Sequence, residues 1–170
     1  CNKRVDYNKF ITNELKTFIN ENNCWINLMK DKNLVYIHSY DQYFFNRKRY
    51  KSFFDKTYFK GDLDSFNFKN CDQKYSGICD YEILNNMDKL ISIEKNNFVI
   101  FLTVNNHIPL EPFYKNSYID CKENFPLNLS EQFCILYNNQ MFFNENISKF
   151  LSNMPENDLL VLFSDTPPMF

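Results

Sequence analysis

Both histidines of the chain stand at the end of an apolar run. His38 directly follows the run LVYI, residues 34–37, and His107 lies in the polar stretch NNHIP that follows the apolar run 98–102. An apolar run of this length is typical of a strand that is covered on both faces, as in the parallel sheet of an α/β domain. In such sheets, ligands bind beyond the carboxyl ends of the strands, which makes both histidines candidate site residues.

A third apolar run, LLVLF at 159–163, leads directly into Ser164, Asp165, Thr166 and Pro167. Imidazole and carboxylate groups at adjacent strand ends can bind a metal, act as an acid–base pair or bind an anionic ester. Each has an ordinary structural alternative: His38 as a hydrogen-bonded histidine at the edge of the core, and Asp165 as a turn aspartate before a proline.

Arg47 is a candidate anion binder. A planar guanidinium can bind phosphate or sulfate with two parallel hydrogen bonds. Its alternative interpretation is a surface cation, because Arg47 belongs to the short basic cluster RKRYK at 47–51, which is typical of a solvated helix face.

The elements that must position these residues alternate along the chain. We expect helices at 7–32 (divided at 20–23), 41–55, 81–95 and 130–153 (interrupted near Asn144), with Asp80 as the N-cap of the third, and strands at 34–37, 57–59, 98–104 and 159–163. Residues 60–78 have the composition of a loop. This order predicts an α/β fold with helix, sheet and helix layers and a mostly parallel sheet.

Composition narrows the function classes. A chain of 170 residues with 44% hydrophobic and 18% aromatic residues can build the core of one domain. A formal charge of −2 and a pI near 5.7 argue against a nucleic-acid-binding surface. With only two glycines, the chain lacks the glycine-rich loops that bind nucleotide phosphates.

The six cysteines form no CxxC pair, which makes a structural zinc site of the usual spacing a poor fit. Disulfides formed in an oxidising compartment explain an even number of cysteines better, with buried free thiols as the alternative. The sequence does not choose among the possible connectivities.

Four segments, in order, resemble a known family. They are IHSYDQYFFNRKRYKSFFDKTYF from Ile37 to Phe59, GICDYEILNNMDKL from Gly77, FLTVNNHIPL from Phe101 and LSNMPENDLLVLFSDTPPMF at the end. Together they resemble lipoteichoic acid synthases and related phosphoglycerol and phosphoethanolamine transferases, which are sulfatase-like proteins of the alkaline phosphatase superfamily. The resemblance implies an alkaline-phosphatase-like fold.

The resemblance also implies roles for individual residues. His38 and Arg47 match substrate-pocket residues, with Phe45 where tryptophan is usual, and His107 matches a histidine that contacts the substrate phosphoryl group or a second metal. Asp165 matches a ligand of a divalent metal (zinc, manganese or calcium). Thr166, however, stands where a metal-binding histidine is expected, and threonine is a much poorer zinc ligand.

By this resemblance, residues 1–170 are a single partial domain, with the nucleophile expected upstream of Cys1 and a further remainder downstream of Phe170. The chain alone is then expected to show no turnover. The complete protein would be a metal-dependent hydrolase or transferase that acts on phosphate or sulfate esters of cell-envelope glycans or lipids. It would be anchored by preceding membrane spans on the extracytoplasmic side of the bacterial inner membrane, in the periplasm. The alternative is an inactive pseudoenzyme or a module that binds an anionic envelope component.

Overall fold

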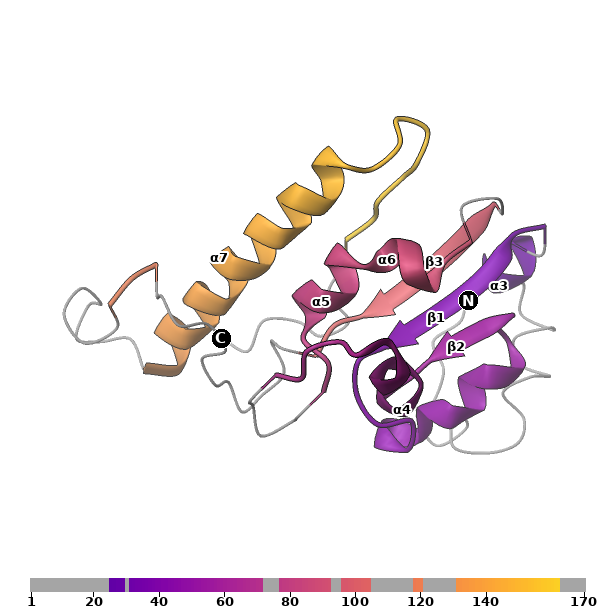
Figure 1. Cartoon of the computed structure of the whole chain (residues 1–170), viewed down its shortest axis with the longest axis horizontal. Helices are drawn as coiled ribbons and strands as arrows, with labels where there is room; N and C mark the ends of the chain where they lie inside the picture. The colour runs from indigo at the N-terminus through magenta and orange to yellow at the C-terminus, as the bar shows by residue number, and fades with distance from the viewer. Residues whose placement is uncertain are drawn as a thin grey trace.

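A parallel sheet lies at the centre of the part of the chain that the structure, a computed structural model, describes: residues 25–29, 31–71, 77–92, 96–104, 118–120 and 131–162. Its strands are β1 (Asn33–His38), β2 (Lys56–Tyr58) and β3 (Asn97–Leu102), in the order β2-β1-β3. Both pairings are parallel, and Figure 1 shows helices packed beside the sheet. The predicted α/β fold class is confirmed.

The central strand β1 is buried on both faces, as its apolar sequence predicts. Val35 and Ile37 belong to the main hydrophobic cluster, together with residues of the helices on that side. Tyr36 alternates to the opposite face, where its ring contacts Tyr50 and Phe59 at centroid distances of 5.3 and 5.9 Å. Because side chains alternate between the faces of a strand, His38 at the end of β1 follows Tyr36 on this second face.

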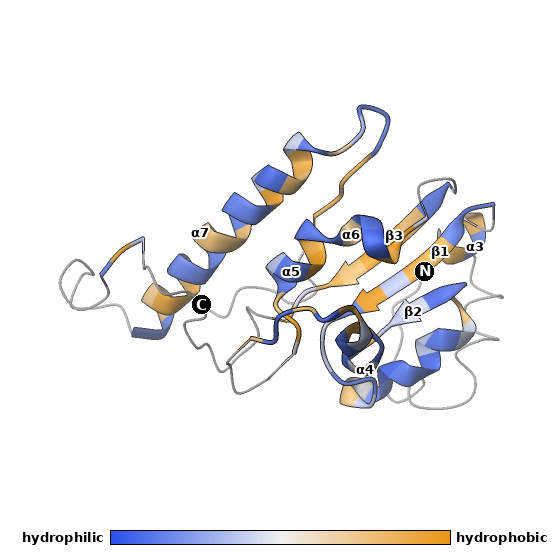
Figure 2. Ribbon diagram, viewed as in Figure 1, coloured by the Kyte–Doolittle hydropathy of each residue, from blue (hydrophilic) through white to orange (hydrophobic). Residues whose placement is uncertain are grey.

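Strand β3 differs from its prediction in burial. All six of its residues are partly exposed, although the apolar run predicted cover on both faces. Among the described strands, β3 has a neighbour on one side alone, at the edge of the sheet. Figure 2 shows that both β1 and β3 are nevertheless largely apolar.

Two short helices, α5 (Asp80–Asn85) and α6 (Met87–Leu90), take the place of the single helix predicted at 81–95. The break falls at Asn86, which has φ −129° and ψ 26°. The Asn86 side chain donates a hydrogen bond to the Glu82 carbonyl at 2.9 Å. Asparagine competes in this way with the helix backbone, which is why it interrupts an otherwise apolar helical pattern.

The segment after β1 is more regular than the sequence predicts. The helix expected at 41–55 is the 3₁₀ helix η1 (Phe44–Ser52), and the strand expected at 57–59 is β2. The stretch predicted as a loop contains α4 (Lys60–Leu63) and a 3₁₀ turn, η2 (Asp64–Phe66). Asp62, an acidic residue in the first turn, stabilises the N-terminus of α4. Its carboxylate accepts a hydrogen bond from the Phe59 backbone N–H at 2.9 Å.

The long helix α7 (Glu131–Ser152) confirms the prediction for 130–153, and it continues through Asn144 without a break. It lies outside α5, with the rings of Tyr81 and Phe142 5.5 Å apart. None of the helices in the described ranges is long and apolar enough to cross a membrane. Of the region predicted helical at 7–32, the structure describes α3 (Trp25–Leu28), and residues 1–24 lie outside its description.

The strand predicted at 159–163 is not formed over the residues that are described there. Residues 159–162 have no regular structure, and Leu159 is 86% exposed. A strand requires a hydrogen-bonded neighbour, and none of the described strands pairs with this run. An apolar run alone was therefore insufficient evidence for a strand.

Candidate anion-binding site

The carboxyl ends of β1 and β3 lie side by side, because His38 pairs with Leu102 in the strand register. The His38 side chain is buried, at 1% exposure, and its Nδ1 lies 3.4 Å from the Leu102 carbonyl oxygen. The rings of Tyr40 and Phe59 stand edge-on to the imidazole, with centroids 6.5 and 6.3 Å away. The imidazole at the strand end is therefore oriented by the Leu102 carbonyl and by edge-on contacts with two aromatic rings.

Arg47 reaches the same imidazole from η1. Its Nη1 lies 3.2 Å from His38 Nε2 and 3.4 Å from Nδ1. The guanidinium carbon is also 5.9 Å from the centre of the Phe44 ring, within the range of a cation–π contact. The structure thus brings together the two residues that the sequence singled out nine positions apart.

The carbonyl partner of His38 indicates which ring nitrogen donates. The Leu102 carbonyl only accepts hydrogen bonds, so the contact with it favours a hydrogen on Nδ1. Arg47 Nη1 lies within 3.4 Å of both ring nitrogens, so that contact is compatible with either tautomer.

The two lysines of the basic cluster have a different environment. Lys48 and Lys51 are exposed, and their ammonium groups lie over the rings of Tyr43 and Phe59 at 5.3 and 5.5 Å. Arg47 is instead half-buried and directed at the strand end. The surface-cation interpretation therefore describes the two lysines and not Arg47.

The backbone immediately before Arg47 is unusual. Asn46 has φ 54°, in the left-handed region, which asparagine adopts more readily than most residues. Its N–H donates to the Tyr43 carbonyl at 2.8 Å. Asn46 is thus well suited to the left-handed backbone conformation at this position, and Arg47 follows it directly in the sequence.

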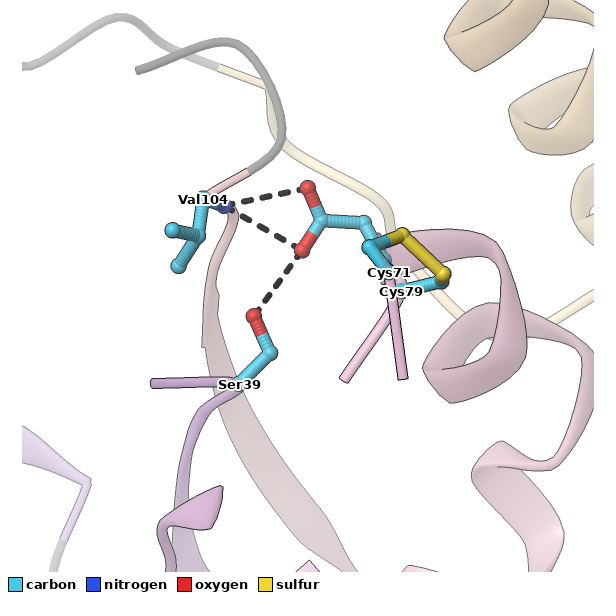
Figure 3. Close-up of a disulfide and its surroundings, with 5 residues drawn as sticks. Ser39, Cys71, Cys79 and Val104 are labelled. Carbon is cyan, nitrogen blue, oxygen red and sulfur yellow. Dashed lines mark hydrogen bonds between the residues drawn. A yellow bond between two sulfur atoms is a disulfide. The ribbon is translucent and has the colours of Figure 1, made fainter. Parts of the chain in front are cut away.

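Asp80 also lies at this edge of the sheet. Its hydrogen bonds to residues at both strand ends were not predicted from the sequence. It was predicted as the N-cap of its helix, but Cys79 occupies that position and Asp80 is the first helical residue. Its carboxylate, 3% exposed, accepts hydrogen bonds from Ser39 Oγ at 3.1 Å and from the Val104 N–H at 3.0 Å (Figure 3). The signal that could have found it is the GICD motif, in which a glycine precedes the aspartate by three positions.

A disulfide between Cys71 and Cys79 closes the loop that leads to Asp80 (Figure 3). Cys134 is also disulfide-bonded. Both observations confirm the predicted disulfides for these three cysteines. The other three, Cys1, Cys24 and Cys121, lie outside the described residues.

Several predicted site residues fall outside the description as well: His107, Ser164, Asp165 and Thr166, and the side chain of Phe45. Their predicted roles remain predictions. Within the described ranges, no group of three or more histidine, cysteine, aspartate or glutamate residues could hold a metal ion. The metal expectation thus rests on residues outside the description, chiefly Asp165.

Comparison with known proteins identifies a known fold for most of the chain. No family model and no curated protein matches the chain. Two solved structures do. The phosphoglycerol transferase GacH of Streptococcus pyogenes, in complex with sn-glycerol-1-phosphate, matches with a TM-score of 0.53 and 22% identity over 72% of this chain and 32% of that chain. The lipoteichoic acid synthase LtaP of Listeria monocytogenes matches with a TM-score of 0.56 and 16% identity over 75% of this chain. The chain spans 31% of that second structure.

Proposed function

Because the chain has the fold of part of a sulfatase-like, lipoteichoic acid synthase-type protein of the alkaline phosphatase superfamily, we propose that it contributes the anion-binding edge of a phosphoglycerol transferase site. The substrate would be a phosphate ester of the cell envelope. The fold similarity supports the class of protein, and the residues at the carboxyl edge of the sheet support the class of ligand.

The contact between Arg47 and His38 carries the proposal. It places a guanidinium and an imidazole together at the carboxyl end of the central parallel strand, where ligands of α/β sheets bind. A guanidinium offers five N–H donors in a planar fork, which suits the oxygens of a phosphate ester. The aromatic rings around His38 lower the local dielectric and strengthen such hydrogen bonds. These residues would bind and orient the ester, and no bond-breaking group is assigned to them.

The match to GacH supports phosphoglycerol as the ester, since that structure contains sn-glycerol-1-phosphate. The proposal retains His107 as a further contact to the phosphoryl group, and Asp165 as a ligand of a divalent metal. The Cys71–Cys79 disulfide supports an oxidising, extracytoplasmic location, because structural disulfides persist in such compartments. An anchor in the inner membrane is part of the same proposal.

A binding function without turnover is the second candidate. It is favoured by Thr166, which stands where the resemblance calls for a metal-binding histidine. A threonine hydroxyl is not a good zinc ligand, so a site built this way would bind the ester without activating it.

The test is a calorimetric titration of the full-length protein, with the expected nucleophile region included, against sn-glycerol-1-phosphate, inorganic phosphate and glycerol, together with an assay of phosphodiester turnover. We expect binding of the phosphate ester and none of glycerol. Turnover that requires a divalent cation supports the transferase, whereas binding without turnover supports the second candidate. Failure of both phosphate compounds to bind would refute the proposed site.

A further inference from the structure

Asp80 stands between the two strand ends that fix the position of His38. We propose that Asp80 is a positioning residue for His38: its buried carboxylate ties the residue after His38 to the end of β3, whose carbonyl orients the imidazole. The consequence of this role for ligand binding rests on the proposed function, but the effect on His38 does not.

The first connection runs through Ser39, the residue next to His38 in sequence. Ser39 Oγ donates to Asp80 Oδ1 at 3.1 Å, and Ser39 is itself fully buried. The Ser39 carbonyl accepts from the Ile78 N–H at 2.8 Å, two residues before Asp80. The backbone directly after His38 is therefore held by both the side chain and the main chain of one short segment.

The second connection runs through β3. Val104 N–H donates to both Asp80 oxygens, at 3.0 and 3.2 Å. Two residues earlier, the Leu102 carbonyl accepts from the His38 imidazole. A loss of the Val104 contact would loosen the end of β3 and, with it, the acceptor that fixes the orientation of the imidazole.

The loop that carries Asp80 is built to hold it in place. The Cys71–Cys79 disulfide ends at the residue before Asp80, and the Cys79 N–H donates to the Lys69 carbonyl at 3.0 Å. Gly77 packs so closely on Ser39 that a Cβ there would lie 2.4 Å from the Ser39 carbonyl oxygen. A carboxylate that is held by these contacts and bonded by two different donors connects both strand ends, as a residue that supports a site must do.

Asp80→Ala and Asp80→Asn separate this role from a general effect of charge. Alanine removes both contacts. Asparagine can keep both, because its carbonyl can accept from Val104 while its amide donates to the rotatable hydroxyl of Ser39. Asp88→Ala is the matched control, since Asp88 is an exposed acid at the start of the neighbouring helix α6.

The readout is the imidazole spectrum of the intact protein, labelled with ¹⁵N-histidine, with His38→Gln to assign the His38 signals. In Asp80→Ala we expect the ring signals of His38 to shift and its Nδ1 proton to exchange about tenfold faster, the scale of the lost hydrogen bond between the Val104 N–H and the Asp80 carboxylate. Asp80→Asn and Asp88→Ala should keep the His38 signature, meaning the ring signals and proton exchange rate, of the unmodified protein. Should Asp80→Ala fail to fold, Ser39→Ala removes one of the two connections and should shift the same signals.

Affinity for sn-glycerol-1-phosphate is measured on the same samples. A changed His38 signature with an affinity lowered about tenfold supports both proposals. If the unmodified protein does not bind the ester but the His38 signature changes in Asp80→Ala, the positioning role stands and the proposed function is refuted. An unchanged His38 signature in folded Asp80→Ala or Ser39→Ala would overturn the positioning role.

Discussion

Nη1 of Arg47 lies 3.2 Å from Nε2 of His38 at the carboxyl end of the central strand. The two side chains come from different elements, β1 and η1, and the left-handed turn at Asn46 lies between them. Both side chains are of types that bind phosphate esters, and the planar guanidinium suits an anion that accepts two parallel hydrogen bonds.

The two glycines of the chain offer a matched pair of substitutions. A Cβ at Gly77 would lie 2.4 Å from the Ser39 backbone oxygen, whereas a Cβ at Gly61 would have no atom within 4 Å. We expect Gly77→Ala to lower the free energy of unfolding by about 1–3 kcal/mol, the usual cost of a forced overlap. Gly61→Ala, in α4, should be neutral or stabilising by about 0.5–1 kcal/mol. Denaturant unfolding of both variants checks this, and equal effects would contradict the close approach at Ser39.

Asn138 holds a backbone segment against α7 with both ends of its carboxamide. Its Oδ1 accepts from the Ile119 N–H at 2.9 Å, its Nδ2 donates to the Ile119 carbonyl at 3.0 Å, and the side chain is fully buried. Asn138→Ala leaves both backbone groups without this partner, so we expect a loss of about 2–4 kcal/mol in the free energy of unfolding.

The exposed Asn144 on the same helix supplies the control for Asn138. Asn144→Ala should change the free energy of unfolding by less than about 0.5 kcal/mol. An equal loss in the free energy of unfolding for both variants would show that the two hydrogen bonds between Asn138 and the Ile119 backbone do not stabilise the fold.

The surface of α7 carries a group with a shifted titration. The pKa of Glu145 lies below its ordinary value of 4.5, chiefly because Lys149 donates a hydrogen bond to it, and also because the Tyr118 hydroxyl does. A lowered pKa in the folded state means that this contribution to stability is complete above pH 4.5 and is lost as the pH falls through the folded-state pKa.

Because Glu145 is fully exposed, we expect the effect on stability to be small and reduced by salt. Titration of the Glu145 carboxyl carbon by NMR should give a pKa below 4.5, and Lys149→Met should raise it. A pKa that stays the same in that variant would show that the hydrogen bond does not form in solution.

Local sequence patterns predicted the parts of the fold that depend on local chemistry. The apolar run before His38 identified the central strand, and the pattern after Ser130 identified α7, because both signals come from residues close in sequence. The run at 159–163 has the same composition, yet residues 159–162 form no strand. Whether an apolar run becomes a strand depends on a neighbour to pair with, and the run itself does not contain that information.

The sequence predicted only part of the site, because local patterns do not contain the contacts between residues that are far apart in the chain. Arg47 and His38 were identified because their types suit an anion and because the segment resembles a known family. Asp80 was misassigned as a helix cap because aspartate before an apolar helical pattern has that local meaning. Its partners, Ser39 and Val104, lie 41 and 24 positions away in sequence, and only the folded chain brings them together.

The central claim, that Arg47 and His38 bind a phosphate ester, is tested most directly by the affinity of Arg47 variants for sn-glycerol-1-phosphate. Lys48→Ala is the matched control, because it also removes one positive charge, from an exposed neighbour on η1. We expect Arg47→Ala to weaken binding about tenfold to a hundredfold, the scale of charge-assisted hydrogen bonds. Arg47→Lys should recover only part of this loss, since an ammonium lacks the planar fork, and Lys48→Ala should have almost no effect. Equal affinities for the Arg47→Ala and Lys48→Ala variants would contradict the claim.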